Sequence, residues 1–242
     1  MLKIDNLTVA VDGKQILDNV NLNIGKGELH ALFGPNGSGK TSLLLTIMGN
    51  PKYKVVSGKI LFKGKDITSL PMDERAKLGI GIAFQNPPVI RGVKLRDMVN
   101  ICAQSGNSNA EELAKRLNLS AFLDRDINLG FSGGETKRSE LLQLAALQPD
   151  FIMLDEPDSG VDLVNIALVG EVINDVLERT KNCTIRDTSG LIITHTGHIL
   201  DYVNADHGHV MIDGTIRCSG KPDGLLKMIK ERGYEECARC LR

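Results

Sequence analysis

Short apolar runs separated by turn residues fill the first part of the chain. Residues 2–9 and 15–24 alternate apolar and polar side chains on either side of Asp12-Gly13, a pair typical of a tight β-hairpin turn. A short, mainly apolar run, Leu29–Phe33, leads into a glycine-rich segment, and residues 40–48 then repeat apolar side chains at helical spacing. We therefore predict two paired strands followed by a strand, a loop and a helix.

The rest of the chain alternates strand and helix patterns around a mostly helical segment. Strands are predicted over 59–62, 80–84, 151–154 and 191–194, a hairpin over 209–212 and 215–218, and helices over 95–103, 110–117, 135–147, 163–178 and 223–232. This order predicts an α/β fold whose mixed sheet has an antiparallel β edge and an inserted helical subdomain. We predict one domain over 1–242, with a catalytic core formed by 1–85 and 148–242 and a helical subdomain over 86–147.

Composition and charge restrict the class of function. With 242 residues, 42% of them hydrophobic and 24% charged, the chain has the composition of an ordinary globular domain. Its net charge of −1 provides no general attraction for nucleic acid, so phosphate chemistry needs a local site. There is no apolar stretch of about 18 residues and no secretory signal, which leads us to expect a cytoplasmic chain that does not insert into a membrane.

The five cysteines are scattered and odd in number, as expected of reduced thiols in a cytoplasmic protein. Cys237 and Cys240 form a single C-x-x-C pair, whereas a closed zinc or iron–sulfur site needs about four ligands. We favour free thiols there, with metal binding as the alternative. His207 and His209 alternate along a predicted strand and are interpreted as packing and edge residues rather than metal ligands.

Residues 34–41 match the phosphate-binding pattern G-x-x-x-x-G-K-[ST] between a predicted strand and a predicted helix. The segment reads Gly34, Pro35, Asn36, Gly37, Ser38, Gly39, Lys40 and Thr41. Its glycines allow the backbone N–H groups to wrap around a phosphate, and the helix N-terminus adds positive potential. Lys40 is expected to reach the β- and γ-phosphates and Thr41 to bind Mg²⁺. The alternative is a glycine-rich turn at the start of a helix.

A second chemical signal is the apolar strand 151–154, which ends in two acidic residues. Asp155 at the end of a buried strand, next to the phosphate loop, is expected to hold the metal ion directly or through water. Glu156 follows and is expected to polarise an attacking water. Alone, an apolar run ending in two acids equally describes a strand that enters solvent.

Between these motifs lies Ser132-Gly133-Gly134-Glu135, which opens a predicted helix and offers a second anion-binding surface. It resembles the signature loop of ABC ATPases. Gln85 resembles their Q-loop residue, Ser159–Asp162 their D-loop, and His195 their switch histidine. Together the motifs cover residues 2–218 and form a specific set, although Gln85 or His195 alone carries little information.

The resemblance implies that two ATP molecules bind between two head-to-tail subunits in an ATP-dependent homodimer. Lys40, Thr41, Gln85, Asp155, Glu156 and His195 would act within one subunit, with Thr41, Gln85 and Asp155 holding Mg²⁺. Ser132, Gly133, Gly134, Glu135 and Asp162 would contact nucleotide from the other subunit. Such a divided site fits phosphoryl transfer, which depends on charge neutralisation and a positioned water.

The longer segment 131–143, with Glu135 and Lys137 in its signature, resembles the SufC family, the ATPase of the SUF iron–sulfur cluster assembly system. This resemblance implies SufB- and SufD-like soluble scaffold proteins as partners. Pro157 after Glu156 is more typical of membrane transporter ATPases, so the ATPase subunit of a membrane ABC transporter is the alternative. A regulatory nucleotide-binding module fits less well because Glu156 and His195 are both present.

Overall fold

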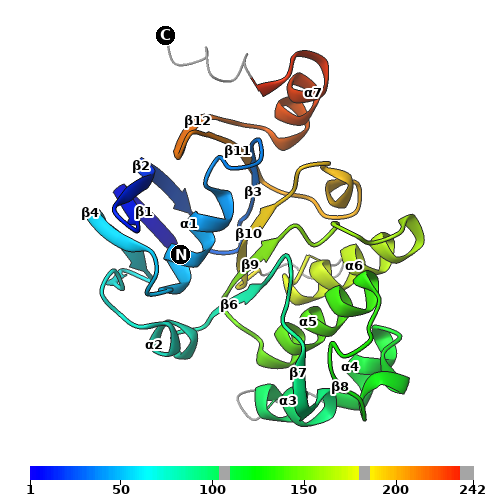
Figure 1. Cartoon of the computed structure of the whole chain (residues 1–242). Helices are drawn as coiled ribbons and strands as arrows, with labels where there is room; N and C mark the ends of the chain where they lie inside the picture. The colour runs from blue at the N-terminus through cyan, green and yellow to red at the C-terminus, as the bar shows by residue number, and fades with distance from the viewer. Residues whose placement is uncertain (104–109, 180–185, 235–242) are drawn as a thin grey trace.

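A six-stranded mixed sheet forms the centre of the computed structural model, which describes residues 1–103, 110–179 and 186–234 (Figure 1). The strand order is β12 (Thr215–Gly220), β11 (His207–Ile212), β3 (Leu29–Phe33), β10 (Ser189–Ile193), β9 (Phe151–Asp155) and β6 (Ile80–Ala83). All neighbouring pairs are parallel except β11 and β12, which form the antiparallel edge. The α/β fold with a mixed sheet and an antiparallel edge is confirmed.

Both faces of this sheet are covered, which explains the unbroken apolar runs in its strands. Ile152 and Leu154 of β9 point into one hydrophobic cluster with residues of the helices α5 (Gly133–Leu147) and α6 (Leu163–Val176). Phe151 and Met153 of the same strand point into a second cluster with residues of α1 (Lys40–Met48). Since successive side chains of a strand face opposite sides, one strand serves both cores.

A second, antiparallel sheet packs on the α1 side and has the order β2 (Lys14–Ile24), β1 (Leu2–Val11), β4 (Lys54–Phe62) and β5 (Lys65–Asp66) (Figure 1). The predicted Asp12-Gly13 turn is confirmed, since both residues adopt positive φ, 51° and 79°. Strand β4 begins five residues before the predicted Lys59 and continues through Gly58, which lies opposite a bulge in β1 formed by Asn6 and Leu7. A Cβ on Gly58 would lie 2.3 Å from the carbonyl oxygen of Asn6.

The segment after β6, which was predicted to be mostly helical, also contains two short strands. Helices α3 (Leu95–Ala103) and α4 (Ala110–Arg116) lie near the predicted positions, and α5 begins two residues before the predicted Glu135. Two short strands were not predicted: β7 (Ile90–Lys94) precedes α3, and β8 (Asp126–Ile127) lies between α4 and α5. They pair with each other. The mainly polar helix α2 (Met72–Lys77) was also missed, as it has too few residues for a periodic pattern. The division at residues 86 and 147 stays a prediction.

The C-terminal part matches the sequence patterns with small shifts. Strand β10 begins at Ser189, two residues before the predicted start, and α6 ends at Val176 instead of Glu178. Two single turns, η1 (Ser120–Phe122) and η2 (His198–Asp201), and the helix α7 (Pro222–Arg232) complete the described elements. Cys237 and Cys240 lie outside the described residues, so their predicted state is untested.

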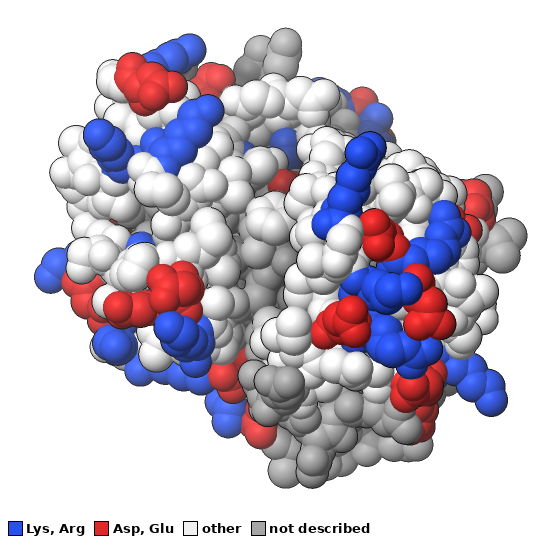
Figure 2. All heavy atoms as spheres, turned by 60° about the horizontal axis from the view of Figure 1, so that its bottom comes forward, with Lys and Arg blue, Asp and Glu red and all other residues white. Residues whose placement is uncertain are grey.

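Basic and acidic side chains lie next to one another on the described part of the face in Figure 2. Ion pairs occur among the described residues, and Arg96 of α3 pairs with Glu111 at 2.5 Å and with Asp124 at 3.0 Å. Within the described ranges, every helix is too short or too polar to traverse a lipid bilayer.

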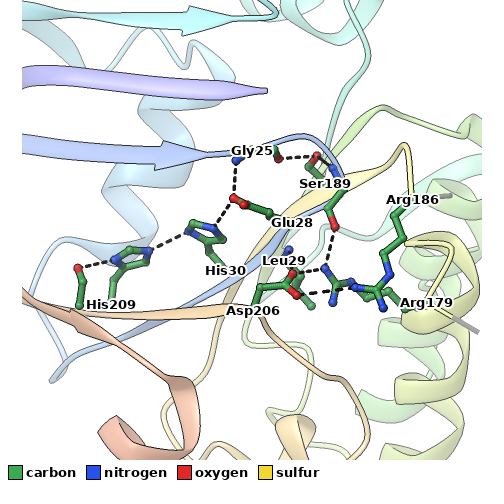
Figure 3. A network of polar contacts seen from close by, with 11 residues as sticks. Gly25, Glu28, Leu29, His30, Arg179, Arg186, Ser189, Asp206 and His209 are labelled. Atoms are coloured by element: carbon green, nitrogen blue, oxygen red, sulfur yellow. Dashed lines mark hydrogen bonds and ion pairs between the residues drawn. The ribbon is translucent and has the colours of Figure 1, made fainter. Parts of the chain in front are cut away.

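A network of polar side chains surrounds the first residues of β3 (Figure 3). His30 lies between Glu28 and His209, with its Nε2 3.1 Å from Glu28 Oε2 and its Nδ1 2.9 Å from His209 Nε2. Asp206 accepts a hydrogen bond from the Leu29 N–H and pairs with Arg179. Burial lowers the pKa of His30 and lowers that of His209 to about 4, so both rings are neutral at pH 7.

Candidate functional site

The phosphate-loop motif lies where the sequence predicts it, between the end of β3 and the start of α1. Gly34, Gly37 and Gly39 all have positive φ, of 155°, 78° and 104°. Gly34 has a second constraint, because a Cβ there would lie only 2.2 Å from the carbonyl oxygen of Met211 on β11. The glycines are therefore required by the loop's backbone conformation and by its close contact with the neighbouring strand.

The Lys40 side chain folds back over the loop. Its ammonium donates hydrogen bonds to the carbonyl oxygens of Gly34 and Pro35, at 2.8 and 2.9 Å. Burial lowers the pKa of Lys40, since the charged form loses hydration. The loop thus encloses a cation at the base of a concave backbone, which suits the binding of an anion.

Asp155 is the last residue of β9 and lies beside this loop. Its side chain is hydrogen-bonded to Thr41. Burial raises the pKa of the Asp155 carboxyl, an effect that the hydrogen bond with Thr41 opposes. Its second oxygen, Oδ1, and the Ser38 hydroxyl are buried without a hydrogen-bond partner among the described residues. Such unpaired oxygens are costly, and their position fits a site for a divalent cation and a phosphate.

Glu156 is contacted by both of the other predicted catalytic side chains. Gln85 Nε2 donates to Glu156 Oε2 at 2.5 Å, and His195 Nε2 lies in close contact with Glu156 Oε1. Glu156 has a φ of 51°, which is uncommon for a residue with a side chain and is stabilised by the tertiary structure around it. The backbone contributes through the Glu156 N–H, which donates to the carbonyl oxygen of Ile193 at 3.0 Å.

These groups meet because four parallel strands end at the same edge of the sheet. The phosphate loop follows β3, Gln85 follows β6, Glu156 follows β9 and His195 follows β10. They border a cavity of about 500 Å³, a volume suited to a small-molecule ligand. The lining residues are Ile16, Asn36, Gly37, Ser38, Gly39, Lys40, Thr41, Ser42, Gln85, Glu156 and His195.

The predicted signature loop lies elsewhere, at the N-terminus of α5. Ser132 and Glu135 form a capping box, in which the Glu135 carboxylate accepts from the Ser132 N–H at 2.7 Å and Ser132 Oγ accepts from the Glu135 N–H at 3.4 Å. Glu135 therefore has a local structural role that its sequence position could have indicated. Among the described residues that line the cavity, none comes from 132–135.

The predicted D-loop packs against the signature loop of the same chain. A Cβ on Gly133 would lie 2.8 Å from the carbonyl oxygen of Gly160. Asp162 accepts from the Asn165 N–H at 3.0 Å and so caps the start of α6. Asp158, in turn, accepts hydrogen bonds from Thr194 and Thr196 on either side of His195, at 2.8 and 2.7 Å.

Two charged residues of α5 connect this helix to the site, although the sequence predicted no role for them there. Lys137 is 6% exposed, and its ammonium donates to the carbonyl oxygens of Phe84 and Gln85, at 3.0 and 2.7 Å. Glu140 accepts from the Phe84 N–H at 2.5 Å. The signal available in the sequence was their spacing of three residues, which places both on one face of the helix.

Comparison with known proteins identifies the family. The sequence pattern described as ABC transporter matches residues 17–159. The chain belongs to the ABC transporter family. It is 42% identical to a probable ATP-dependent transporter of Synechocystis sp., over 97% of this chain and 94% of that one. It is 38% identical to a probable ABC transporter ATP-binding protein of Streptococcus pyogenes, over 100% of this chain and 96% of that one.

Solved structures of ABC transporter ATP-binding cassettes share the fold. One nucleotide-free cassette has a TM-score of 0.76 and 25% identity and covers 98% of both chains. A cassette in its ADP conformation has a TM-score of 0.75 and 27% identity and covers 99% of this chain and 98% of that one. The predicted ABC ATPase fold is thus confirmed, and the chain is an ATP-binding subunit of an ABC transporter-type system.

Proposed function

We propose that this ABC ATPase subunit hydrolyses ATP, with Glu156 as the residue that polarises the attacking water. The observation that carries this proposal is the pair of contacts that hold Glu156 beside the phosphate loop, one from Gln85 and one from His195. A carboxylate fixed by two partners at the edge of a phosphate site can orient a water and accept its proton.

The residues of the site fit Mg²⁺ as the cofactor. Thr41 provides a hydroxyl oxygen, Asp155 an unpaired carboxylate oxygen and Gln85 an amide oxygen, and Mg²⁺ prefers such oxygen ligands. When bound, the ion supplies positive charge that offsets the negative charge of the triphosphate. Lys40 and the backbone of residues 34–39 bind the phosphates, while Ile16 provides an apolar contact for the base.

We further propose that each site is completed by a second copy of the chain. The observation that supports this is the position of residues 132–135 and Asp162, which lie outside the lining of the cavity in their own chain. The N-terminus of α5 is a suitable anion-binding surface for the nucleotide of another subunit. Hydrolysis would then depend on closure of the dimer.

The first experiment uses Glu156→Gln, which retains the shape of the side chain but removes the base. With Mg-ATP we expect hydrolysis to fall at least 100-fold and the chain to shift to the mass of a dimer in light scattering. The matched control is Glu74→Gln, which alters an exposed glutamate on α2. A Glu156→Gln chain that remains monomeric in saturating Mg-ATP would contradict the dimer, and unchanged hydrolysis would contradict the role of Glu156.

Complementation separates the two halves of the composite site. Lys40→Met disables the phosphate loop, and Gly134→Asp disables the signature loop, so each variant alone should be inactive. A mixed dimer contains one site with both an intact phosphate loop and an intact signature loop. Mixing the two variants is therefore expected to restore part of the activity, and no recovery would argue against a site shared between subunits.

For the partners, we propose SufB- and SufD-like soluble scaffold proteins of iron–sulfur cluster assembly, with the chain acting in the cytoplasm. The signature segment 131–143 supports this proposal through its resemblance at Glu135, which caps the start of α5, and at Lys137, which bonds to the segment after β6. The second candidate is a membrane ABC transporter, which is favoured by Pro157 and by the names of the relatives, a probable ATP-dependent transporter and a probable ABC transporter ATP-binding protein.

A direct binding comparison distinguishes the two. The purified chain is mixed with a purified SufB–SufD-type scaffold complex and, separately, with a detergent-solubilised ABC transporter membrane subunit from the same organism. Co-elution with the scaffold and an ATPase rate raised by it would support the assembly role. Co-elution with the membrane subunit alone would favour the transporter and leave the proposed ATP chemistry intact.

A further inference from the structure

A cluster of metal-ligating side chains lies at the start of β3, at the opposite end of that strand from the phosphate loop. Glu28 directly precedes the strand, His30 is its second residue, and His207 is the first residue of the neighbouring strand β11. The register pairs His207 with His30, and a two-residue spacing places Glu28 on the same side of β3 as His30. These residues have no part in the proposed ATP chemistry.

The ligand atoms of these three side chains converge. One oxygen of Glu28 and one ring nitrogen each of His30 and His207 all lie within 4.8 Å of one another. The rings of His30 and His207 meet edge to face with centroids 4.9 Å apart. His30 is buried, whereas His207 is exposed, so its side chain has room to rotate into a closed coordination geometry.

Neighbouring groups hold two of the three ligands in place. Glu28 Oε2 accepts from the Gly25 N–H at 2.6 Å, and His30 Nδ1 lies 2.9 Å from His209 Nε2. His209 Nδ1 in turn lies 2.7 Å from Ser219 Oγ, and Figure 3 shows this line of contacts from Glu28 through His30 to His209. Metal-ligating histidines are typically oriented by such a contact at the other ring nitrogen.

The hydrogen bonds that link Glu28, His30, His209 and Ser219 can be oriented in two ways, depending on the tautomers of the two histidines. If His209 donates to His30, the Nε2–H of His30 points at the Glu28 carboxylate, and the network is complete without an ion. If His30 Nδ1–H donates to His209 and His209 Nδ1–H donates to Ser219, the lone pair of His30 Nε2 faces Glu28 and His207. A cation at the cluster requires the second orientation, because it needs the free lone pair of His30 Nε2.

We propose that Glu28, His30 and His207 form a binding site for a divalent transition-metal ion of the zinc class. Two imidazole nitrogens and one carboxylate oxygen are ligands that Zn²⁺ accepts, whereas Mg²⁺ prefers oxygen alone. Three protein ligands leave a coordination position for water or another ligand. The ion would tie the start of β3 to the start of β11.

The test measures metal binding by the full chain. After removal of metals with a chelator, the chain is saturated with Mg-ADP to occupy the nucleotide site and is titrated with Co²⁺, followed by visible absorption. We expect one equivalent of Co²⁺ with the bands of a nitrogen- and oxygen-coordinated ion, displaced by Zn²⁺. His207→Ala should weaken the binding roughly 100-fold, and Ser219→Ala, which affects only the orienting contact, about 10-fold.

His198→Ala is the matched control, because His198 is another exposed histidine and lies outside the cluster. It should bind Co²⁺ as the original chain does. Thermal unfolding provides a second readout, in which Zn²⁺ raises the Tm of the original chain and of His198→Ala but not that of His207→Ala. Equal Co²⁺ binding by all variants, or no stoichiometric binding by the original chain, would overturn the proposal.

Discussion

The ammonium of Lys137 donates a hydrogen bond to the carbonyl oxygen of Gln85 across 2.7 Å and so joins helix α5 to the segment that follows β6. The same ammonium also bonds to Phe84 and approaches the Asp155 carbonyl oxygen at 3.5 Å. One buried cation therefore holds two of the chain segments that carry the proposed catalytic residues. It lies in the helix that the signature loop opens, so a movement of that loop can reach Gln85 through α5.

Replacing this cation with an apolar side chain should loosen the segment at Gln85. Lys137→Met leaves the Phe84 and Gln85 carbonyl oxygens without their buried donor, at an expected cost of about 1–3 kcal/mol in unfolding free energy. We also expect a lower kcat for ATP, since Gln85 is no longer held toward Glu156. Urea unfolding and steady-state kinetics check both, with the exposed Lys115→Met as control. A Lys137→Met chain as stable and active as that control would contradict the coupling.

The buried Glu140 carboxyl should make the unfolding free energy of the chain depend on pH. Burial raises its pKa to about 7, although the Phe84 N–H and Lys137 both act to lower it. In the folded state Glu140 binds its proton more tightly than in the unfolded chain, where the pKa is about 4.3. The contribution to stability is therefore complete below about pH 4 and is lost as the pH rises through about 7.

The expected loss between pH 5 and pH 8 is on the order of 3 kcal/mol of unfolding free energy. Glu140→Gln retains an acceptor for the Phe84 N–H but cannot ionise, so its stability should change less over the same range. Urea unfolding at a series of pH values compares the two chains. Parallel curves for both would mean that Glu140 is already ionised in the folded state at pH 5.

Two glycines of the phosphate loop should respond differently to a methyl group. A Cβ on Gly34 would lie 2.2 Å from the Met211 carbonyl oxygen, whereas one on Gly37 would meet no atom within 4 Å. Gly37→Ala should lower the unfolding free energy by about 1 kcal/mol, the cost of a positive φ for a residue with a side chain. Gly34→Ala should lower it by about 3 kcal/mol. Unfolding without nucleotide measures the difference, and equal losses would contradict the close contact with β11.

The two glycines of the signature loop offer a similar pair. Gly133→Ala should destabilise the chain, because its Cβ would lie 2.8 Å from the Gly160 carbonyl oxygen. Gly134→Ala has only ordinary contacts, at 3.9 Å or more, and alanine in a helix is more favourable than glycine by about 0.5–1 kcal/mol. We expect Gly134→Ala to be at least as stable as the original chain yet to hydrolyse ATP at least tenfold more slowly.

Unchanged stability together with slower hydrolysis in Gly134→Ala would show that Gly134 acts in the dimer and not in folding. The methyl group of Gly134→Ala adds bulk at a helix N-terminus, where a phosphate from the other subunit would approach the backbone. Thermal unfolding of the free chain and ATPase assays over a range of protein concentrations provide the two readouts. Full hydrolysis by Gly134→Ala would remove this surface from the proposed site.

Much of the fold and part of the site could be predicted because their determinants are local. The phosphate loop is specified by closely spaced glycines, one lysine and one threonine between a strand and a helix, and these elements lie where the patterns predict. Strand β9 could be predicted because burial on both faces requires a continuous apolar run. The short elements α2, β7 and β8 could not, since their few residues form no period and depend on tertiary contacts.

The sequence by itself determined most of the strands, the main helices, the phosphate loop and the family resemblance, because each depends on residues close together along the chain. Only the tertiary structure decided which distant side chains meet. Gln85 reaches Glu156 across 71 residues because β6 is placed beside β9, and His30 meets His207 because β11 pairs with β3. The physical reason is that strand order and register follow from the packing of two hydrophobic cores on the sheet, an energy shared by residues from the whole chain.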